Sequence, residues 1–151
     1  MNRDTKKYAH GLKRIWVHES FKVKYCHKIF IHKQVRDACQ EIMLETAKEY
    51  SIEIKYIGFD ADHLHFIPDL GRYSEPYIRK LFKGRTARRL LKQFWWLKQT
   101  YFYGSGLWGR QYYCYAIGSD MAVLGKYVQK QQFFTAMHNP EQRTLMEYHP
   151  V

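Results

Sequence analysis

The sequence predicts one α+β domain in which helices cover an antiparallel sheet of four strands. Short runs of alternating apolar and polar residues, typical of strands, are interleaved with longer runs in which apolar residues recur at helical spacing. The 151 residues are 46% hydrophobic and 26% charged, which is typical of a globular chain large enough to bury one core.

The first half of the chain predicts a strand, a helix and a hairpin. Alternating apolar residues indicate a strand within residues 14–26. A stripe of apolar residues at helical spacing, from Val35 to Met43, indicates a helix over 32–50. Strands are expected over 52–57 and 62–67, and the segment 58–61 between them is expected to be a turn.

The second half predicts two helices on either side of a further strand. Ser74 is expected to cap a helix over 75–94, which is interrupted near Gly84 and resumes with Thr86 as its second cap. A strand is expected over 111–117, where aromatic residues are frequent.

A last helix is expected over 119–132. The elements before it match the split βαβ, or ferredoxin-like, arrangement, with helices on one face of the sheet. We therefore expect a flexible basic segment over 1–11, the folded domain over 12–134 and an irregular tail over 135–151.

The charge balance points to a polyanionic partner. Lys and Arg number 25 against 14 Asp and Glu, which gives a formal net charge of +11. Nucleic acid is the first candidate and an anionic membrane surface the second. Aromatic residues reach 17%, and their rings interleaved with cations suit unpaired bases and phosphates. A ribosomal or other RNA-binding protein would fit the same composition.

The sequence lacks membrane, secretion and nucleotide signals. No apolar run approaches the roughly 18 residues that span a bilayer, and the polar N-terminus does not resemble a secretion signal. No phosphate-binding P-loop is present, so we expect no nucleotide cofactor. We expect a cytoplasmic, nucleoid-associated protein. Cys26, Cys39 and Cys114 lie far apart, which predicts buried reduced thiols and not a thiolate zinc site.

A pair of histidines is the first candidate for chemistry. His63 and His65 flank Leu64 on an expected strand, so both imidazoles should point to one face of the sheet. Two imidazoles at this spacing can bind one divalent metal ion. The ordinary alternative is a pair of partly exposed histidines on a sheet.

A tyrosine and a glutamine on the last helix are the second candidate. Tyr127 and Gln131 are one helical turn apart and therefore lie on the same side. A tyrosine hydroxyl can attack phosphorus, and an amide oxygen can complete a metal site. Taken alone, this spacing also fits a structural tyrosine.

The third candidate is a basic helix. Its cations stand among leucines and aromatic residues, and no acid follows Glu75 before Asp120, so a phosphate-binding surface is predicted in preference to a merely solvated face. The candidate DNA contacts are Arg79, Lys83, Arg85, Arg88 and Arg89.

Other residues of these types receive a structural interpretation. Three tyrosines of the last expected strand should pack within the sheet: Tyr112, Tyr113 and Tyr115. The histidines without partner spacing should lie at the surface or be hydrogen-bonded: His10, His18, His27, His32, His138 and His149.

Together the motifs resemble the tyrosine HUH transposases of the smallest bacterial and archaeal insertion sequences, which move DNA as single strands. The family's Asp-His-hydrophobic-His strand is matched by 62–65, and its Tyr-x-x-x-Gln helix by 127–131. The basic-helix motif is matched at Leu81, Lys83, Gly84, Thr86 and Arg88, and the Trp-Gly-Arg-x-Tyr segment at 108–112. The resemblance spans about residues 15 to 132, with the motifs in the family's order.

The resemblance implies a mechanism. His63, His65 and Gln131 would hold Mg²⁺ or Mn²⁺, and Tyr127 would attack the DNA to leave a 5′-phosphotyrosine and a free 3′-OH. It also implies a homodimer that binds DNA hairpins at the ends of the element. A replication initiator with the same chemistry and a host-adopted relative are alternatives. A non-catalytic RNA- or single-stranded-DNA-binding module on the same scaffold is an alternative of another class.

Overall fold

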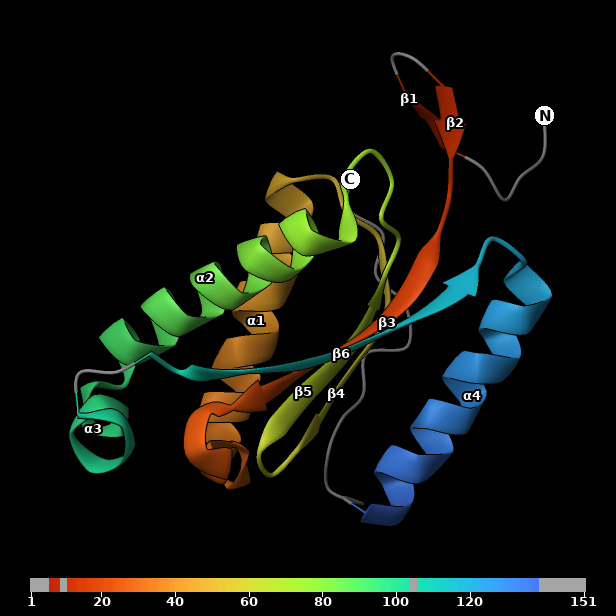
Figure 1. Cartoon of the computed structure of the whole chain (residues 1–151). Helices are drawn as coiled ribbons and strands as arrows, with labels where there is room; N and C mark the ends of the chain where they lie inside the picture. Colours follow the sequence, from red (N-terminus) through yellow and green to blue (C-terminus); the bar gives the residue numbers. More distant parts are fainter. Residues whose placement is uncertain (1–5, 9–10, 104–105, 139–151) are drawn as a thin grey trace.

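The computed structural model describes residues 6–8, 11–103 and 106–138, which form an α+β fold (Figure 1). The elements in chain order are β1 (Lys6–Tyr8), β2 (Gly11–Lys13), β3 (Trp16–Val23), η1 (Lys24–Cys26), η2 (Ile29–Ile31), α1 (Lys33–Glu49), β4 (Ile54–Asp60), β5 (His63–Pro68), α2 (Glu75–Gln93), α3 (Trp95–Leu97), the π-helical turn η3 (Lys98–Phe102), β6 (Trp108–Gly118) and α4 (Met121–His138).

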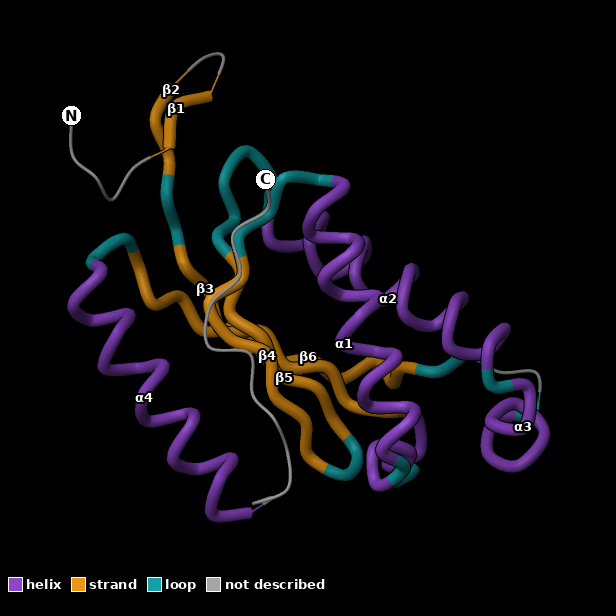
Figure 2. Tube along the Cα trace, turned by 180° about the vertical axis from the view of Figure 1, so that it is seen from behind, coloured by secondary structure: helices purple, strands orange, loops and turns teal. Residues whose placement is uncertain are grey.

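Four strands form the main sheet, in the spatial order β4-β5-β3-β6 with every neighbouring pair antiparallel. Helices α1 and α2 lie on one face and α4 lies on the other, so the sheet is sandwiched between them (Figures 1 and 2). The predicted α+β, split βαβ fold with an added C-terminal helix is therefore confirmed.

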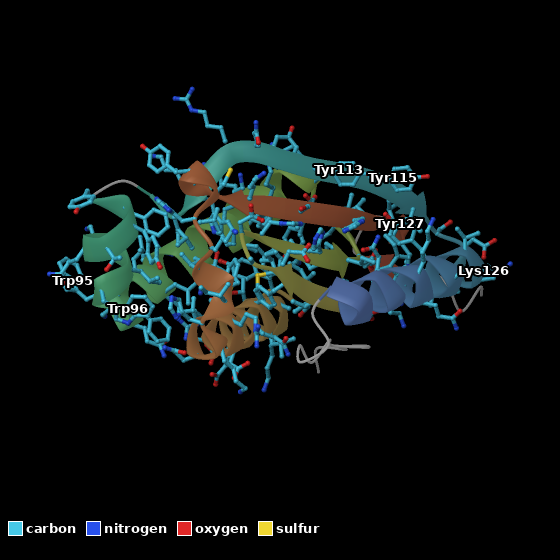
Figure 3. The ribbon with its side chains drawn as sticks, turned by 90° about the horizontal axis from the view of Figure 1, so that it is seen from below. Trp95, Trp96, Tyr113, Tyr115, Lys126 and Tyr127 are labelled. Carbon is cyan, nitrogen blue, oxygen red and sulfur yellow. The ribbon has the colours of Figure 1, made fainter. Side chains whose placement is uncertain are left out.

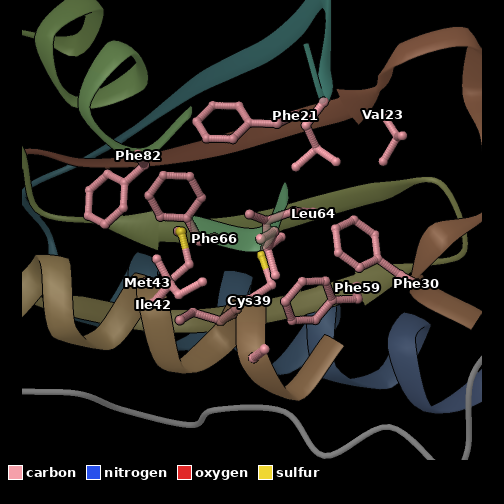
Figure 4. Packing of buried hydrophobic residues seen from close by; sticks show 14 of the residues in the cluster. Phe21, Val23, Phe30, Cys39, Ile42, Met43, Phe59, Leu64, Phe66 and Phe82 are labelled. Atoms are coloured by element: carbon pink, nitrogen blue, oxygen red, sulfur yellow. The ribbon is translucent and has the colours of Figure 1, made fainter. Parts of the chain in front are cut away.

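The main core lies between the sheet and helices α1 and α2. The apolar stripe predicted for α1 is buried, and in Figure 4 its Cys39, Ile42 and Met43 face the sheet residues Phe59 and Phe66. Phe82 of α2 packs against Phe66 with ring centroids 5.0 Å apart. Burying such side chains is the main source of the stability that holds the two helices on the sheet.

A smaller apolar cluster attaches α4 to the opposite face. Trp16, Tyr56 and Ile67 of the sheet are each 0% exposed, and Leu124 and Val128 of α4 pack onto them. Strand alternation explains the two clusters, because successive residues of a strand point to opposite faces. The polar residues of the α4-facing side lie beside this cluster.

Two of the predicted breaks in secondary structure are wrong. The segment 58–61 is not a turn, since β4 runs to Asp60 and Phe59 is buried in the core at 2% exposed. Helix α2 is uninterrupted at Gly84, and Thr86 lies inside it. An exposed glycine weakens a helix by only about 1 kcal/mol, which the buried Phe82 and Leu90 on either side outweigh.

The structure adds two details at the chain ends. Within the segment expected to be flexible, β1 and β2 pair as a short antiparallel hairpin. The last helix continues beyond the predicted domain boundary, to His138. Residues 1–5 and most of the expected tail, 139–151, lie outside the described residues. No helix in the described part of the chain is both long and apolar enough to cross a membrane.

Gly58 is a position where the fold requires the absence of a side chain. A Cβ atom there would lie 2.3 Å from the Tyr56 hydroxyl oxygen, and Tyr56 is fully buried beneath α4. We expect Gly58→Ala to lower the free energy of unfolding by about 1–3 kcal/mol, because a packed ring must move.

Chemical denaturation of Gly58→Ala and of the control Gly84→Ala tests this prediction. A Cβ on the exposed Gly84 would meet nothing within 4 Å, so this variant should gain up to about 1 kcal/mol from the higher helix propensity of alanine. Equal stability of Gly58→Ala and the wild type would contradict the assigned packing.

Candidate active site

The polar residues on the α4-facing side of the sheet converge on three histidines. His63 and His65 alternate on β5 as predicted, and His18 of β3 lies beside them. The strand register places Ser20 opposite His65 on one side and Gly58 opposite it on the other. These small neighbours leave room for the imidazoles.

Asp60 at the end of β4 joins the predicted histidine pair. Its Oδ2 atom is 2.7 Å from His63 Nε2 and 2.9 Å from His65 Nε2. The second nitrogen of His63, Nδ1, lies 2.8 Å from Asp62 Oδ1. Asp60, His63 and His65 therefore form a cluster whose donor atoms all lie within 4.8 Å of one another and could hold a metal ion.

His18 connects this cluster to Tyr127. Its Nε2 atom is 3.3 Å from His65 Nδ1, and its Nδ1 atom is 2.6 Å from the Tyr127 hydroxyl. The side chain of Gln131 hydrogen-bonds the same hydroxyl. A continuous chain of polar contacts thus runs from Gln131 through Tyr127, His18 and His65 to Asp60.

The candidate site has two parts that differ in their electrostatics, the first of which is the Asp60–His63–His65 cluster. Hydrogen bonds from His63 and His65 hold the pKa of Asp60 well below its usual range. Burial alone would lower the pKa of His63, but hydrogen bonds to Asp60 and Asp62 raise it above the ordinary value. The two carboxylates therefore attract positive charge to this end of the site.

The other part of the site favours neutral groups. Burial, with a smaller contribution from His65, lowers the pKa of His18 to about 4. Burial, with Tyr113 and Tyr115 beside it, raises the pKa of Tyr127 to about 12. At neutral pH an uncharged imidazole therefore contacts a protonated phenol.

Three tyrosines of β6 are exposed, contrary to the expectation that they pack within the sheet. Tyr112, Tyr113 and Tyr115 are each 50–52% exposed. Tyr115 stacks on Tyr127 with ring planes 8° apart (Figure 3). Tyr113 meets His18 edge-on. Beside them is a groove of about 240 Å³, lined by Ser20, Lys22, His63, Gln111, Tyr112 and Tyr113.

Most of the predicted DNA-contacting cations of α2 already have acidic partners. Arg85 binds Glu49 at 2.8 Å, and Arg89 pairs with Glu45. Both glutamates belong to α1, so the neighbouring helix supplies the acids that the basic run lacks. Arg79 binds Glu75 of its own helix at 3.0 Å. Lys83 and the exposed Arg88 have no ion pair within the described residues, and DNA contact by this helix stays a prediction.

The basic-helix motif of α2 packs against the Trp-Gly-Arg-x-Tyr segment at the start of β6. The Trp108 indole nitrogen donates to the Thr86 hydroxyl at 2.8 Å, and Lys83 donates to the Gly109 carbonyl at 3.2 Å. Thr86 itself donates to the Phe82 carbonyl at 2.7 Å. Thr86 therefore anchors the start of β6 and is not a helix cap, and Lys83 is engaged in the same contact.

Sequence reasoning missed two members of the site. His18 was grouped with the ordinary histidines because nothing near it in sequence is a ligand, yet it is buried at 4% exposed between His65 and Tyr127. Asp60 was placed in a turn. The alternation of β3 and β4 could have placed both on the histidine face, but only with the strand register known.

Comparison with known proteins identifies the family of this chain. Residues 12–131 match the family model described as "Transposase IS200 like", so the chain belongs to the IS200-like transposase family. That family comprises DNA-cleaving enzymes. No curated protein matches the chain.

Solved structures show the same fold. A protein from Deinococcus radiodurans R1 assigned as a transposase superposes with a TM-score of 0.67 at 24% identity, covering 88% of this chain and 98% of its own. The REP-associated tyrosine transposase bound to a REP hairpin superposes with a TM-score of 0.53 at 11% identity, covering 85% and 73%.

The contact between Asp60 and His63 predicts a titration change. Asp60→Asn should lower the pKa of His63, because it removes the negative charge that stabilises the protonated imidazole. NMR titration of the His63 ring in metal-free protein measures this change. Asp37→Asn, which removes a surface partner of Lys33 on α1, serves as the control. An unchanged His63 titration in Asp60→Asn would contradict the assignment.

The same pair should make stability depend on pH. The raised pKa of His63 stabilises the fold below the ordinary pKa of histidine, and this is lost as pH rises through the raised value. The lowered pKa of Asp60 stabilises the fold above about pH 4, the ordinary aspartate value, and this is lost on acidification. The free energy of unfolding in urea should therefore differ most between Asp60→Asn and the wild type from about pH 4 up to the raised pKa of His63.

Proposed function

We propose that this transposase cleaves and rejoins single-stranded DNA at the ends of an insertion sequence through a 5′-phosphotyrosine on Tyr127. The strongest support is a chain of contacts: the His18 imidazole touches the Tyr127 hydroxyl with one nitrogen and His65 with the other. Only this one side chain separates Tyr127 from the His63–His65 pair. A non-catalytic RNA-binding module has no need for a tyrosine held in this way.

The residues present fit a divalent metal ion. Two imidazoles and a carboxylate point their donor atoms at one another, and Asp60 adds negative charge that a cation would neutralise. This donor set suits Mn²⁺ better than Mg²⁺, which prefers oxygen ligands throughout. His63, His65 and Asp60 would hold the ion. Gln131, which the resemblance implies as a ligand, stays a prediction. A bound ion would polarise the scissile phosphate and neutralise the charge that develops on its oxygens.

His18 is suited to accept the proton of the nucleophile. Tyr127 is protonated at neutral pH, so its hydroxyl must lose a proton as it attacks phosphorus. His18 is uncharged there, and its Nδ1 atom lies 2.6 Å from the hydroxyl. The Tyr127 oxygen then bonds to phosphorus, and the departing 3′ oxygen takes up a proton. Reversal of these steps by another 3′-OH reseals the strand without ATP.

The substrate strand is proposed to cross the exposed face of β6. Tyr113 and Tyr115 offer half-exposed rings for stacking on unpaired bases, and Lys22 in the adjoining groove offers a charge for a phosphate. Bases paired in a duplex could not reach these rings, which supports a single-stranded substrate. Hairpin recognition is part of the same proposal and is supported by the structural neighbour that is bound to a REP hairpin. The homodimer is part of the proposal because the resemblance of the motifs implies it.

Denaturing gels test the proposed chemistry. The protein is incubated with single-stranded oligonucleotides from the ends of its element, with Mn²⁺ or with EDTA. We expect a covalent protein–DNA adduct that requires metal and is absent in Tyr127→Phe, because phenylalanine lacks the attacking oxygen. His63→Ala should lose cleavage and still bind hairpin DNA. A duplex of the same sequence should give no adduct.

Two outcomes would contradict the proposal. If Tyr127→Phe cleaves as fast as the wild type, the nucleophile is another group. If the wild type binds nucleic acid in a strongly salt-dependent way but forms no adduct with any metal, the chain is a binding module.

His18→Ala tests the role of the buried imidazole. Loss of a general base should slow adduct formation by about 10²- to 10⁴-fold. The pH–rate profile should also move to higher pH, since the Tyr127 phenol must then ionise unaided. His27→Ala, which removes an imidazole that packs at a tilt against Tyr101 away from the site, is the control. If His18→Ala slows adduct formation but leaves the pH dependence of the rate unchanged, the role of His18 is purely structural.

A further inference from the structure

A second cluster of metal-ligand side chains lies on the side of the sheet that faces α2. Glu19 of β3 and Cys114 of β6 are directly opposite each other across the strand pair, and Glu75 begins α2 above them. One donor atom from each residue lies within 4.8 Å of the other two. None of these residues belongs to the histidine site, because strand alternation points Glu19 away from His18.

Glu19 is the unusual member of this cluster. Its side chain is 0% exposed, and the polar groups that interact with its carboxylate are those of Glu75 and Cys114, the other two members of the cluster. An ionised carboxylate buried beside a second carboxylate and a thiol costs several kcal/mol, so such a group takes up either a proton or a cation.

The two cations near Glu19 form their hydrogen bonds with other groups. Arg79 binds both oxygens of Glu75 at 3.0 Å and lies over the Tyr112 ring, 3.7 Å from its centroid. Lys83 donates to the Gly109 carbonyl. Glu75 therefore has an ion-pair partner in Arg79, whereas Glu19 has no ion pair among the described residues.

Cys114 supplies the third donor and an opening to solvent. Cys114 is an exposed residue of the edge strand, and Cys26 is exposed as well, both contrary to the expectation of buried cysteines; Cys39 is buried as expected. Burial of the sulfur and the charges of Glu19 and Glu75 raise the pKa of Cys114 to about 12. Burial and Glu75 also raise the pKa of Glu19. The cluster without a metal thus retains protons that a divalent ion would displace.

We propose that Glu19, Glu75 and Cys114 form a second divalent-metal site that takes zinc or a similar thiophilic ion. Sulfur selects such ions over magnesium, and a fourth position on the exposed side is open to water. On binding, the thiol and Glu19 protons leave to solvent. The two carboxylates, the thiolate and the Arg79 guanidinium then balance the charge of the ion. The metal would join the edge strand β6, which carries the exposed tyrosines, to β3 and α2.

Cobalt absorption tests this site separately from the proposed cleavage. Co²⁺ added to reduced, metal-free protein should produce a near-ultraviolet thiolate-to-cobalt band that Zn²⁺ removes. Cys114→Ser should abolish the band, and the exposed-cysteine control Cys26→Ser should keep it. The double variant His63→Ala, His65→Ala should also keep it, so failure of the proposed function leaves this result unaffected.

Glu19→Gln decides whether the buried carboxylate is a ligand. It should weaken cobalt binding by about tenfold or more, the size of effect typical of groups that support a metal site. Absence of the band in wild type, its survival in Cys114→Ser, or unchanged affinity in Glu19→Gln would each overturn the proposal. The two glutamates would then share a proton in place of a metal.

Discussion

The antiparallel register between β3 and β5 is the constraint on which the site depends. It sets Ser20 opposite His65 and Lys22 opposite His63, so that His18, His63 and His65 share one face of the sheet. A slip of one residue would turn every side chain of a strand to the other face. Phe21, Leu64 and Phe66 hold the register because they are fully buried on the opposite face. The hydrophobic core and the polar site are thus two results of one pairing.

The sequence predicts the order of elements and the local part of the site. His63 and His65 lie two residues apart on one strand, and Tyr127 and Gln131 one turn apart on one helix, so local geometry suffices to pair them. His18 and Asp60 could not be assigned in this way, because they meet the pair only across strands. Thr86 was misread for a similar reason, since its indole partner Trp108 lies 22 residues further along the chain.

The basic helix shows how charge in a sequence differs from charge on a surface. Five cations of α2 were predicted to face DNA, but Glu45 and Glu49 of the adjacent α1 neutralise two of them and Glu75 a third. Exposed ion pairs of this kind contribute little to stability, and a phosphate could displace the acids at small cost. The +11 net charge therefore does not measure the unpaired charge on α2, and Lys22 places one cation in the groove beside the histidines.

The attachment of α4 has a mechanical consequence. Of its described side chains only Leu124 and Val128 are buried, and burial of two such residues contributes on the order of 3–6 kcal/mol. The strand before it ends at Gly118, whose φ of 100° is readily adopted only by glycine. Tyr127, the proposed nucleophile, is thus carried by a helix with few buried side chains among those described, and a glycine in a left-handed conformation precedes that helix. Detaching α4 from the sheet therefore costs less buried apolar surface than detaching α1, whose whole apolar stripe is buried.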